Sequence, residues 1–518
     1  MIGAVCFKGI NMNKLFEFIE SVNSVVNDFV WVRIGLVLLF GVGVILTVST
    51  RFFQLTHIHH WFSSTIGSIF KKDNKGGDKK GSVSQFQALC TALGATIGTG
   101  NIAGVSAAIV LGGPGAVFWM WVAAFFGMVT KFCEITLGIY FRRRNEKGEW
   151  AGGAMYYLKD GLGAKKGCKT LGAVLAAVFA VFTMIASFGI GNMGQVNTIV
   201  LNFEGAMFKG VDLGAVFGIP VLSIILGAVI MALAGVIILG GISRIASFAE
   251  KVVPFMAIGY VLGSVVLLIV NYKNFCPAFI SIFRFAFNNE ALVGGAAGAG
   301  IAQIITQGCK RGMFSNEAGL GSSVMVHSSA DVREPVKQGM WGIFEVFCDT
   351  FIVCSMSAMV VLSSGLVDLE RGVIKEGVND DTLVSTAFGS VFGSFGEIFV
   401  ALAIFLFAFT TIVGWSQYGA KATEYLFGVG SMKIYQIIFV AAVILGAVMQ
   451  SSLAWDISDT FNGLMMIPNL IGVLAMLPLV TKLVRNYVDR RIKGKKDVVP
   501  MLSYDRTIQS EMEKKLNK

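Results

Sequence analysis

Two glycine-rich stretches without a charged residue are the first candidates for a binding site in this sequence. One runs from Gly94 to Gly104, and the other runs from Gly294 to Gly300 and includes Gly298. Glycine lowers helix propensity, so each stretch is predicted to interrupt a helix. An interrupted helix frees backbone N–H groups that can hold a carboxylate and carbonyl groups that can hold a cation. The alternative for either stretch is close packing of small residues between intact helices.

The elements that carry these stretches are predicted to span a membrane. The chain has 518 residues, of which 55% are hydrophobic and 14% are charged, whereas soluble domains have roughly 25% charged residues. Apolar residues recur in blocks of about 20, the length of helix that crosses a bilayer. We therefore expect an all-α polytopic membrane protein with about 11 transmembrane helices. The blocks are residues 32–50, 86–111, 115–141, 171–200, 214–240, 249–271, 291–309, 339–364, 395–420, 433–452 and 460–483.

The loops between these blocks differ in charge. Alternate loops are rich in lysine and arginine, and one of them holds Lys310, Arg311, Arg333 and Lys337. The long loop of the opposite set, residues 365–394, is acidic. The positive-inside rule therefore predicts an N-terminus outside and a C-terminus in the cytoplasm, in a cell membrane. The same rule explains the net charge of +10, so no nucleic acid is expected as a partner.

The blocks also predict an internal symmetry. Residues 13–30 have the pattern of an interfacial amphipathic helix. When this segment and the first span are set aside in residues 1–85, ten blocks remain, five in residues 86–271 and five in residues 272–486, before a basic tail at 487–518. Halves with an odd number of helices have opposite orientations, and the two glycine stretches fall in the first block of each half. Paired interruptions of this kind predict a midplane site in an inverted-repeat transporter.

The sequence resembles the alanine or glycine:cation symporter family over nearly its whole length. The motifs that carry the resemblance are Gly94 to Gly104, Gly112-Gly113-Pro114-Gly115, Gly152-Gly153-Ala154-Met155-Tyr156-Tyr157 and the run from Lys310 to Gly319. The resemblance implies a LeuT-type fold and symport of alanine or glycine with Na⁺, without an organic cofactor and with no obligate protein partner. Coupling to H⁺ and an ion channel are the alternatives. An enzyme is not expected, because no nucleophile with a base is evident.

The resemblance also implies the residues that bind the ion. Backbone carbonyls of Gly94 and Ile97 and the hydroxyls of Thr410 and Thr411 would hold Na⁺. Neutral oxygen ligands suit this hard cation. Adjacent threonines in a helix otherwise bond back to their own carbonyls.

The substrate carboxylate would lie against the N–H groups of Thr99, Gly100 and Asn101. Trp415, one turn after Thr411, would limit the size of the substrate side chain, or else it is an interfacial anchor. Gln195 is a polar residue inside an apolar block, so we expect it to face the interior and to bind substrate.

Charged residues in apolar sequence form the last group of candidates. Glu345 and Asp349 lie four residues apart on one helical face, within or near the hydrocarbon. They fit a proton or cation relay and a buried structural network equally well. The segment Lys310 to Ser323 fits either an inner gate or a folded loop. The eight cysteines form no CxxC pair, so neither a disulfide nor a metal cluster is expected.

Overall fold

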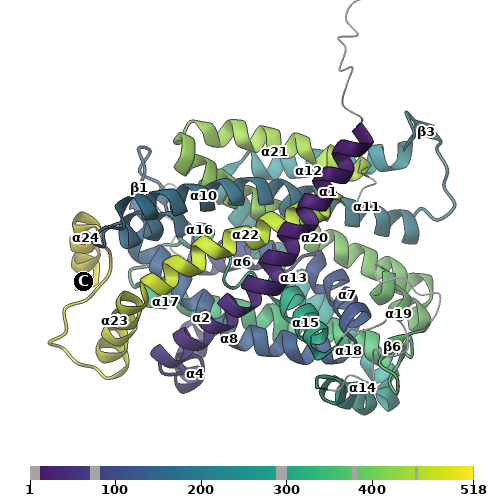
Figure 1. The fold of residues 1–518 in the computed structure, drawn as a ribbon, viewed down its shortest axis with the longest axis horizontal. Coiled ribbons are helices and arrows are strands. Elements are labelled where there is room, and N and C mark those ends of the chain that lie inside the picture. The colour runs from purple at the N-terminus through teal and green to yellow at the C-terminus, as the bar shows by residue number, and fades with distance from the viewer. Residues whose placement is uncertain (1–11, 70–81, 288–299, 376–381, 450–452, 517–518) are drawn as a thin grey trace, which may run out of the picture.

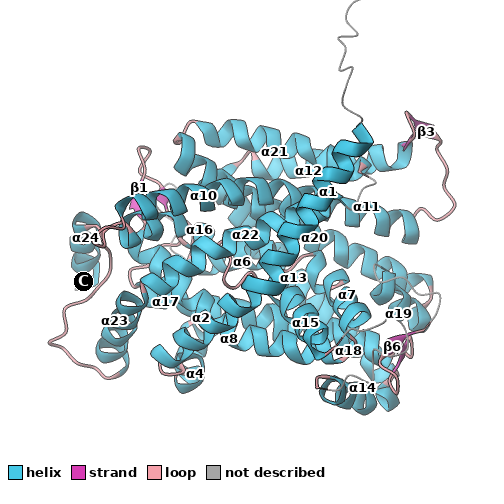
Figure 2. Cartoon of the chain, in the orientation of Figure 1, coloured by secondary structure: helices cyan, strands magenta, loops and turns pink. Residues whose placement is uncertain are grey.

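Helices make up most of this computed structural model, which describes residues 12–69, 82–287, 300–375, 382–449 and 453–516 (Figure 2). The strands of the described residues form three short antiparallel hairpins. These are β1 (Arg143–Arg144) with β2 (Trp150–Ala151), β3 (Ala215–Val216) with β4 (Ile219–Pro220), and β5 (Val367–Asp368) with β6 (Val373–Ile374).

The N-terminal region is one long helix followed by short ones. α1 (Met12–Asp28), the π-helical η1 (Phe29–Gly35) and α2 (Leu36–Ser49) follow one another, because the residues at both junctions keep right-handed helical angles. The predicted interfacial helix is therefore continuous with the first predicted span. Arg51 and Phe52 have φ of 58° and 55° and end this helix. α3 (Phe53–Thr56), α4 (Ile58–Ser64) and α5 (Ile66–Ile69) follow.

The first predicted interruption is present. α6 (Gln85–Thr96) begins with a capping box in which the Ser84 hydroxyl accepts from the Gln87 N–H. It ends at Thr96 and is followed by the 3-10 turn η3 (Thr99–Asn101) and by α7 (Ala103–Gly112). The helix therefore breaks within the glycine stretch, where the sequence predicts it.

Long helices and some short helical segments follow the first break. They are α8 (Gly115–Phe141), α9 (Ala154–Tyr156), η4 (Tyr157–Leu162), α10 (Lys169–Phe188), the π-helical η5 (Gly189–Met193), α11 (Gly194–Ala206), α12 (Val221–Ile238), α13 (Gly241–Val270) and α14 (Tyr272–Phe285).

The second half contains a break at residues 317–323, which the sequence analysis did not predict. α15 (Ile301–Asn316) ends at Glu317, whose φ is 55°, and α16 (Val324–His327) begins after an irregular segment, residues 317–323. Lys310 and Arg311 are thus inside a helix, and the prediction of a loop at these residues is wrong. The physical reason is that a partner from another helix satisfies the Lys310 charge, since Lys310 Nζ lies 2.6 Å from Asp459 Oδ2 of α22. Residues 288–299, which include Gly298 and most of the second glycine stretch, lie outside the described residues.

The remaining helices complete the bundle. They are α17 (Pro335–Val346), the π-helical η7 (Phe347–Cys354), α18 (Ser355–Ser363), α19 (Leu383–Phe392), α20 (Ser394–Phe427), α21 (Ser431–Val448), α22 (Leu453–Ala475), α23 (Leu477–Tyr487), η9 (Val488–Ile492) and α24 (Arg506–Leu516). Figure 1 shows α12 and α21 side by side along one edge, with α14, α18 and α19 at one end of the molecule.

Eight helices of the described residues are long and apolar enough to cross a membrane, or nine if the pair bent by 62° after Ala475 is one span. The count of eleven is not confirmed. The two broken helices fall outside this count, since each of their halves is shorter than a span.

Small residues let neighbouring helices of the bundle pack closely. α8 packs along α15 and α17, and a Cβ on Gly308 would lie 2.3 Å from the carbonyl oxygen of Ala116. Such backbone contact is possible only where a glycine faces the neighbouring helix.

We predict that Gly308→Ala lowers the free energy of unfolding by about 1–3 kcal/mol, because the methyl group forces α15 away from α8. Gly259→Ala on α13 is the matched control, since a Cβ there has no heavy atom within 4 Å. The control should be neutral or stabilising, as alanine is the better helix former. Thermal unfolding of the purified protein in detergent measures both, and equal midpoints would contradict the packing argument.

Candidate functional site

Side chains satisfy the backbone of the first break. The N–H of Gly98 donates to Asn101 Oδ1 at 2.9 Å, and the N–H of Thr99 donates to Gln195 Oε1 at 3.2 Å. Asn101 N–H bonds the Gly98 carbonyl at 3.2 Å, within the turn. The buried Gln195 on α11 therefore faces the interior, as predicted, and contacts the break directly. Two donors that a continuous helix would use are held by amide side chains instead.

α20 packs against the carbonyl side of the same break. Thr411 Oγ1 lies 3.1 Å from the Gly94 carbonyl and 3.0 Å from the Phe407 carbonyl. Thr410 Oγ1 lies 2.9 Å from the Phe407 carbonyl, so this hydroxyl bonds back to its own helix. The Thr410 hydroxyl also lies 3.5 Å from Met256 Sδ of α13, so of the two hydroxyls the one on Thr411 bonds the Gly94 carbonyl.

Gly94 and Gly98 permit this approach. A Cβ on Gly94 would lie 3.3 Å from the Thr410 Cβ, and a Cβ on Gly98 would lie 2.5 Å from Thr411 Oγ1. Ile97, at the end of α6, is 1% exposed. The four residues predicted to bind the cation are thus neighbours at one buried point.

Asp349 joins the first break to the second broken helix. Its Oδ1 accepts from Asn101 Nδ2 at 2.7 Å and from Ser315 Oγ at 3.0 Å, and its Oδ2 accepts from Thr350 Oγ1 at 2.9 Å. The Asp349 side chain is fully buried. The partners that these bonds give it are neutral donors, so it couples the two helices without a salt bridge at this point.

Phe314 and Ser315 are site residues that the sequence analysis missed. A Cβ on Gly100 would lie 3.4 Å from the Phe314 ring and 3.6 Å from the Ser315 Cα. Both residues belong to the Lys310 to Gly319 motif, but the motif was interpreted as a cytoplasmic segment. Gly300 caps the far end of α15, 15 residues before Ser315 and roughly 22 Å away at the rise of an α-helix. The structure therefore does not bring Gly300 to the first break.

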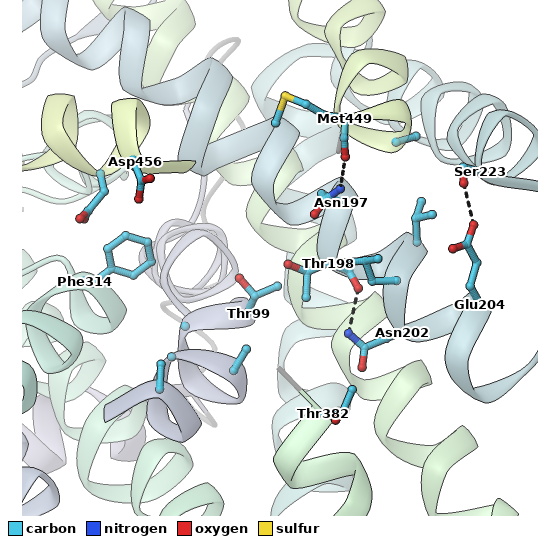
Figure 3. A pocket seen from close by; sticks show the side chains of 18 of the residues that line it. Thr99, Asn197, Thr198, Asn202, Glu204, Ser223, Phe314, Thr382, Met449 and Asp456 are labelled. Carbon is cyan, nitrogen blue, oxygen red and sulfur yellow. Dashed lines mark hydrogen bonds between the residues drawn. The ribbon is translucent and has the colours of Figure 1, made fainter. Parts of the chain in front are cut away.

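A cavity of about 660 Å³ opens onto the first break. Thr99 and Gly100 line it, and Figure 3 shows Thr99 between Phe314 and Asp456 on one side and Asn197, Thr198 and Asn202 on the other. Charged residues line the same cavity, namely Lys310, Arg311, Glu204, Asp456 and Asp459. The cavity gives a small polar molecule access to the unwound backbone.

Trp415 lies deeper than this cavity. It is 2% exposed and packs against Gly191 of η5, where a Cβ would lie 2.4 Å from the Trp415 Cβ. Its ring also makes an edge contact with Tyr418. The alternative of an interfacial anchor is therefore wrong, because Trp415 is in the buried middle of α20 rather than at its end.

The GxGxxG sequence at residues 189–194 coincides with η5 and the start of α11. Its glycines have neighbours too close for a Cβ at Gly189 and Gly191. These glycines serve helix packing, as expected for a membrane helix.

Glu345, the partner of Asp349 in the sequence pattern, lies in a separate buried cluster. It bonds Lys131 Nζ at 2.7 Å and His327 Nε2 at 3.1 Å. The two carboxylates thus lie one turn apart on one helix but have different partners.

Comparison with known proteins agrees with this architecture. A family model described as the sodium:alanine symporter family matches residues 16–501. The sodium/alanine symporter AgcS of Methanococcus maripaludis is 41% identical over 467 residues, which are 90% of this chain and 96% of that protein. The "Probable sodium/glutamine symporter GlnT" of Bacillus subtilis is 32% identical over 490 residues, 93% of each chain. The solved structure of a Na⁺-coupled sialic acid symporter, 13% identical, aligns over 96% of both chains with a TM-score of 0.50 and shares the LeuT-type fold.

We predict that Gly98→Ala reduces amino-acid uptake by about tenfold or more, equal to at least about 1.4 kcal/mol. The added methyl group would displace the Thr411 hydroxyl from the Gly94 carbonyl. Gly41→Ala on α2 is the control, because a Cβ there has no heavy atom within 4 Å. Uptake into proteoliposomes, normalised to folded protein, measures the effect, and equal rates for the two variants would show that the approach at Gly98 does not matter.

Proposed function

The chain belongs to the sodium:alanine symporter family, and on that premise we propose that it carries alanine or glycine into the cell together with Na⁺ by alternating access. The protein is a multi-pass membrane transporter, a cation-coupled amino-acid symporter rather than an enzyme. One observation carries the finer proposal. The unwound backbone at Gly98 to Asn101 lies between a hydroxyl of α20 and a cavity that a small polar molecule can enter.

The proposed Na⁺ site consists of the Gly94 and Ile97 carbonyls with the Thr410 and Thr411 hydroxyls. The 3.1 Å contact of Thr411 Oγ1 with the Gly94 carbonyl supports it, since two oxygen ligands from different helices already converge. Oxygen donors suit hard cations, and neutral oxygens leave the positive charge available to attract an anionic group. Binding would order the end of α6 against α20.

The proposed substrate site is the backbone of Thr99, Gly100 and Asn101. Thr99 and Gly100 line the cavity, which supports contact with a substrate carboxylate. Gln195 Oε1 accepts from the Thr99 N–H in this structure, so we propose that the substrate carboxylate replaces Gln195 at this N–H and that the released amide bonds the substrate. The Phe314 ring, which lies 3.4 Å from the Cβ position of Gly100 and lines the cavity, would form one wall of this site. Trp415 does not line the cavity, so we propose that it limits the substrate side chain indirectly, through its packing on Gly191.

Asp349 supports a second candidate, symport with H⁺. Its carboxylate is fully buried and bonded to neutral donors, and a buried carboxylate in a membrane protein is a natural proton acceptor. The proton would bind between the two broken helices. We retain Na⁺ as the first candidate because the proposed cation ligands need no titratable group.

The proposed orientation places the cavity on the outer face. The cavity lining includes Glu204, Ser223 and Thr382, which belong to loops and helix ends on the side predicted to be extracellular. Lys310 and Arg311 line the same cavity from within α15, so they no longer count as cytoplasmic loop charges. The N-terminus would lie on the same side and the basic tail in the cytoplasm.

We predict that purified protein in proteoliposomes accumulates labelled alanine when an inward Na⁺ gradient is imposed. A proton gradient without Na⁺ should give no accumulation, because the proposed driving ion is absent. Labelled glycine and glutamine are tested in parallel to define the substrate. Accumulation driven by the proton gradient alone would replace Na⁺ by H⁺ in this proposal.

We also predict that Thr411→Ala raises the Na⁺ concentration for half-maximal uptake roughly fivefold, equal to about 1 kcal/mol of lost ion binding. Thr410→Ala should have a smaller effect, because the Thr411 hydroxyl bonds the Gly94 carbonyl as well as the Phe407 carbonyl, whereas the Thr410 hydroxyl bonds Phe407 and Met256. Thr423→Ala is the matched control, because its buried hydroxyl on the same helix bonds only back to Gly419 among the described residues. An unchanged Na⁺ dependence in Thr411→Ala would remove α20 from the ion site.

A further inference from the structure

Buried charged or titratable side chains from several helices border the second break, residues 317–323, and three of them form one connected cluster. Lys131 comes from α8, His327 from α16 and Glu345 from α17, and all three side chains are 0% exposed. None of them lines the cavity. A group with no access to the cavity does not bind the transported molecules in this conformation, so these residues need another explanation.

Lys131 holds the end of α15. Its Nζ donates to the Asn316 carbonyl at 2.7 Å and to Glu345 Oε1 at 2.7 Å. Asn316 is the last residue of α15, where carbonyl groups lose their helical partners. An ammonium group at this end of a helix also interacts favourably with the helix dipole.

His327 holds the other side of the break. Its Nε2 lies 3.1 Å from Glu345 Oε2, and its Nδ1 lies 2.8 Å from Gln338 Nε2. His327 is the last residue of α16, the helix that begins after the break. The two oxygens of one carboxylate, Glu345, therefore tie together the chain before the break and the chain after it.

The break reaches the proposed site within one residue of this cluster. Asn316, which Lys131 holds, follows Ser315, whose hydroxyl bonds Asp349 and through it Asn101. A shift of the α15 end would move Ser315 relative to both. Separating a buried ion pair is costly, so the pair keeps its two helices in one relative position. Such a pair can fix the end of α15 relative to its neighbours.

We infer that Lys131, Glu345 and His327 are positioning residues that hold the second broken helix in register with the ion and substrate site. This inference rests on the proposed function in one respect, namely that the first break is the ion and substrate site. The contacts that fix residues 317–323 are independent of the transported molecules, and hydrogen exchange measures their effect separately.

The test is the double variant Lys131→Met with Glu345→Gln, which removes both charges of the pair without leaving either one alone in the interior. Two quantities are measured on the full chain. Hydrogen exchange in detergent should be about tenfold or more faster for backbone amides of residues 316–323. Na⁺-driven alanine uptake should need roughly fivefold more Na⁺ for half-maximal rate when normalised to folded protein.

Lys421→Met with Glu424→Gln is the matched control. This pair is also buried, with Nζ and Oε2 2.8 Å apart, but both residues lie on α20 and border no break. The control should leave exchange at residues 316–323 and the Na⁺ dependence unchanged, even if its thermal midpoint falls by as much. A merely structural role of the Lys131 pair predicts that same pattern, a lower midpoint with neither other change, and that pattern overturns the inference.

His327→Leu keeps the Lys131–Glu345 pair and releases only α16, so it serves if the double variant does not fold. It should accelerate exchange at residues 317–323 in the same direction, and unchanged exchange in a folded His327→Leu protein overturns the inference. If the wild-type protein does not transport alanine, the proposed function fails while the exchange data still decide the positioning role.

Discussion

The constraint on which this structure depends is that an unwound backbone inside a membrane bundle must find hydrogen-bond partners within the protein. Each unsatisfied peptide group in an apolar surrounding costs several kcal/mol, so helices normally run unbroken. Here two helices break, and side chains from the break itself or from other helices take the place of the missing helical bonds. Asn101 and Gln195 do this at Gly98 and Thr99, and Lys131 and Asn469 do it at the carbonyls of Asn316 and Gly319.

The need for these partners explains the unusual composition of the interior. Buried polar residues are concentrated on the helices that face the breaks, and Asp349 serves both breaks at once through Asn101 and Ser315. Glycines allow the helices to come close enough for such contacts, as at Gly98 against Thr411 and at Gly308 against Ala116. Small-residue packing therefore lets the polar side chains reach the unwound backbone that they satisfy.

The unwound backbone and the nearby hydroxyl groups also suit the ion binding that a symporter needs. Backbone dipoles and hydroxyl groups bind ions without a fixed charge of their own, so the site can be emptied and refilled at a modest cost in electrostatic energy. Asp349 bonds Asn101 and Ser315, whereas other charged side chains lie along the cavity wall or in the buried cluster around Glu345. This separation keeps the ion pairs away from the first break, as the proposed transport mechanism requires.

The sequence alone determined that this is a helical membrane protein of the alanine or glycine:cation symporter type, because hydrophobic length and glycine motifs are local properties of the chain. It also located the first break and the inward-facing Gln195. It did not locate the second break, because residues 317–323 are rich in polar and small residues and look like a surface loop. Only the tertiary structure decides that Lys131, His327, Glu345 and Asn469 surround this segment, since partners that are up to about 200 residues apart in sequence leave no periodic signal. The contact between Asp349 and both broken helices is of the same kind, for a buried carboxylate can be found in a sequence but its partners cannot.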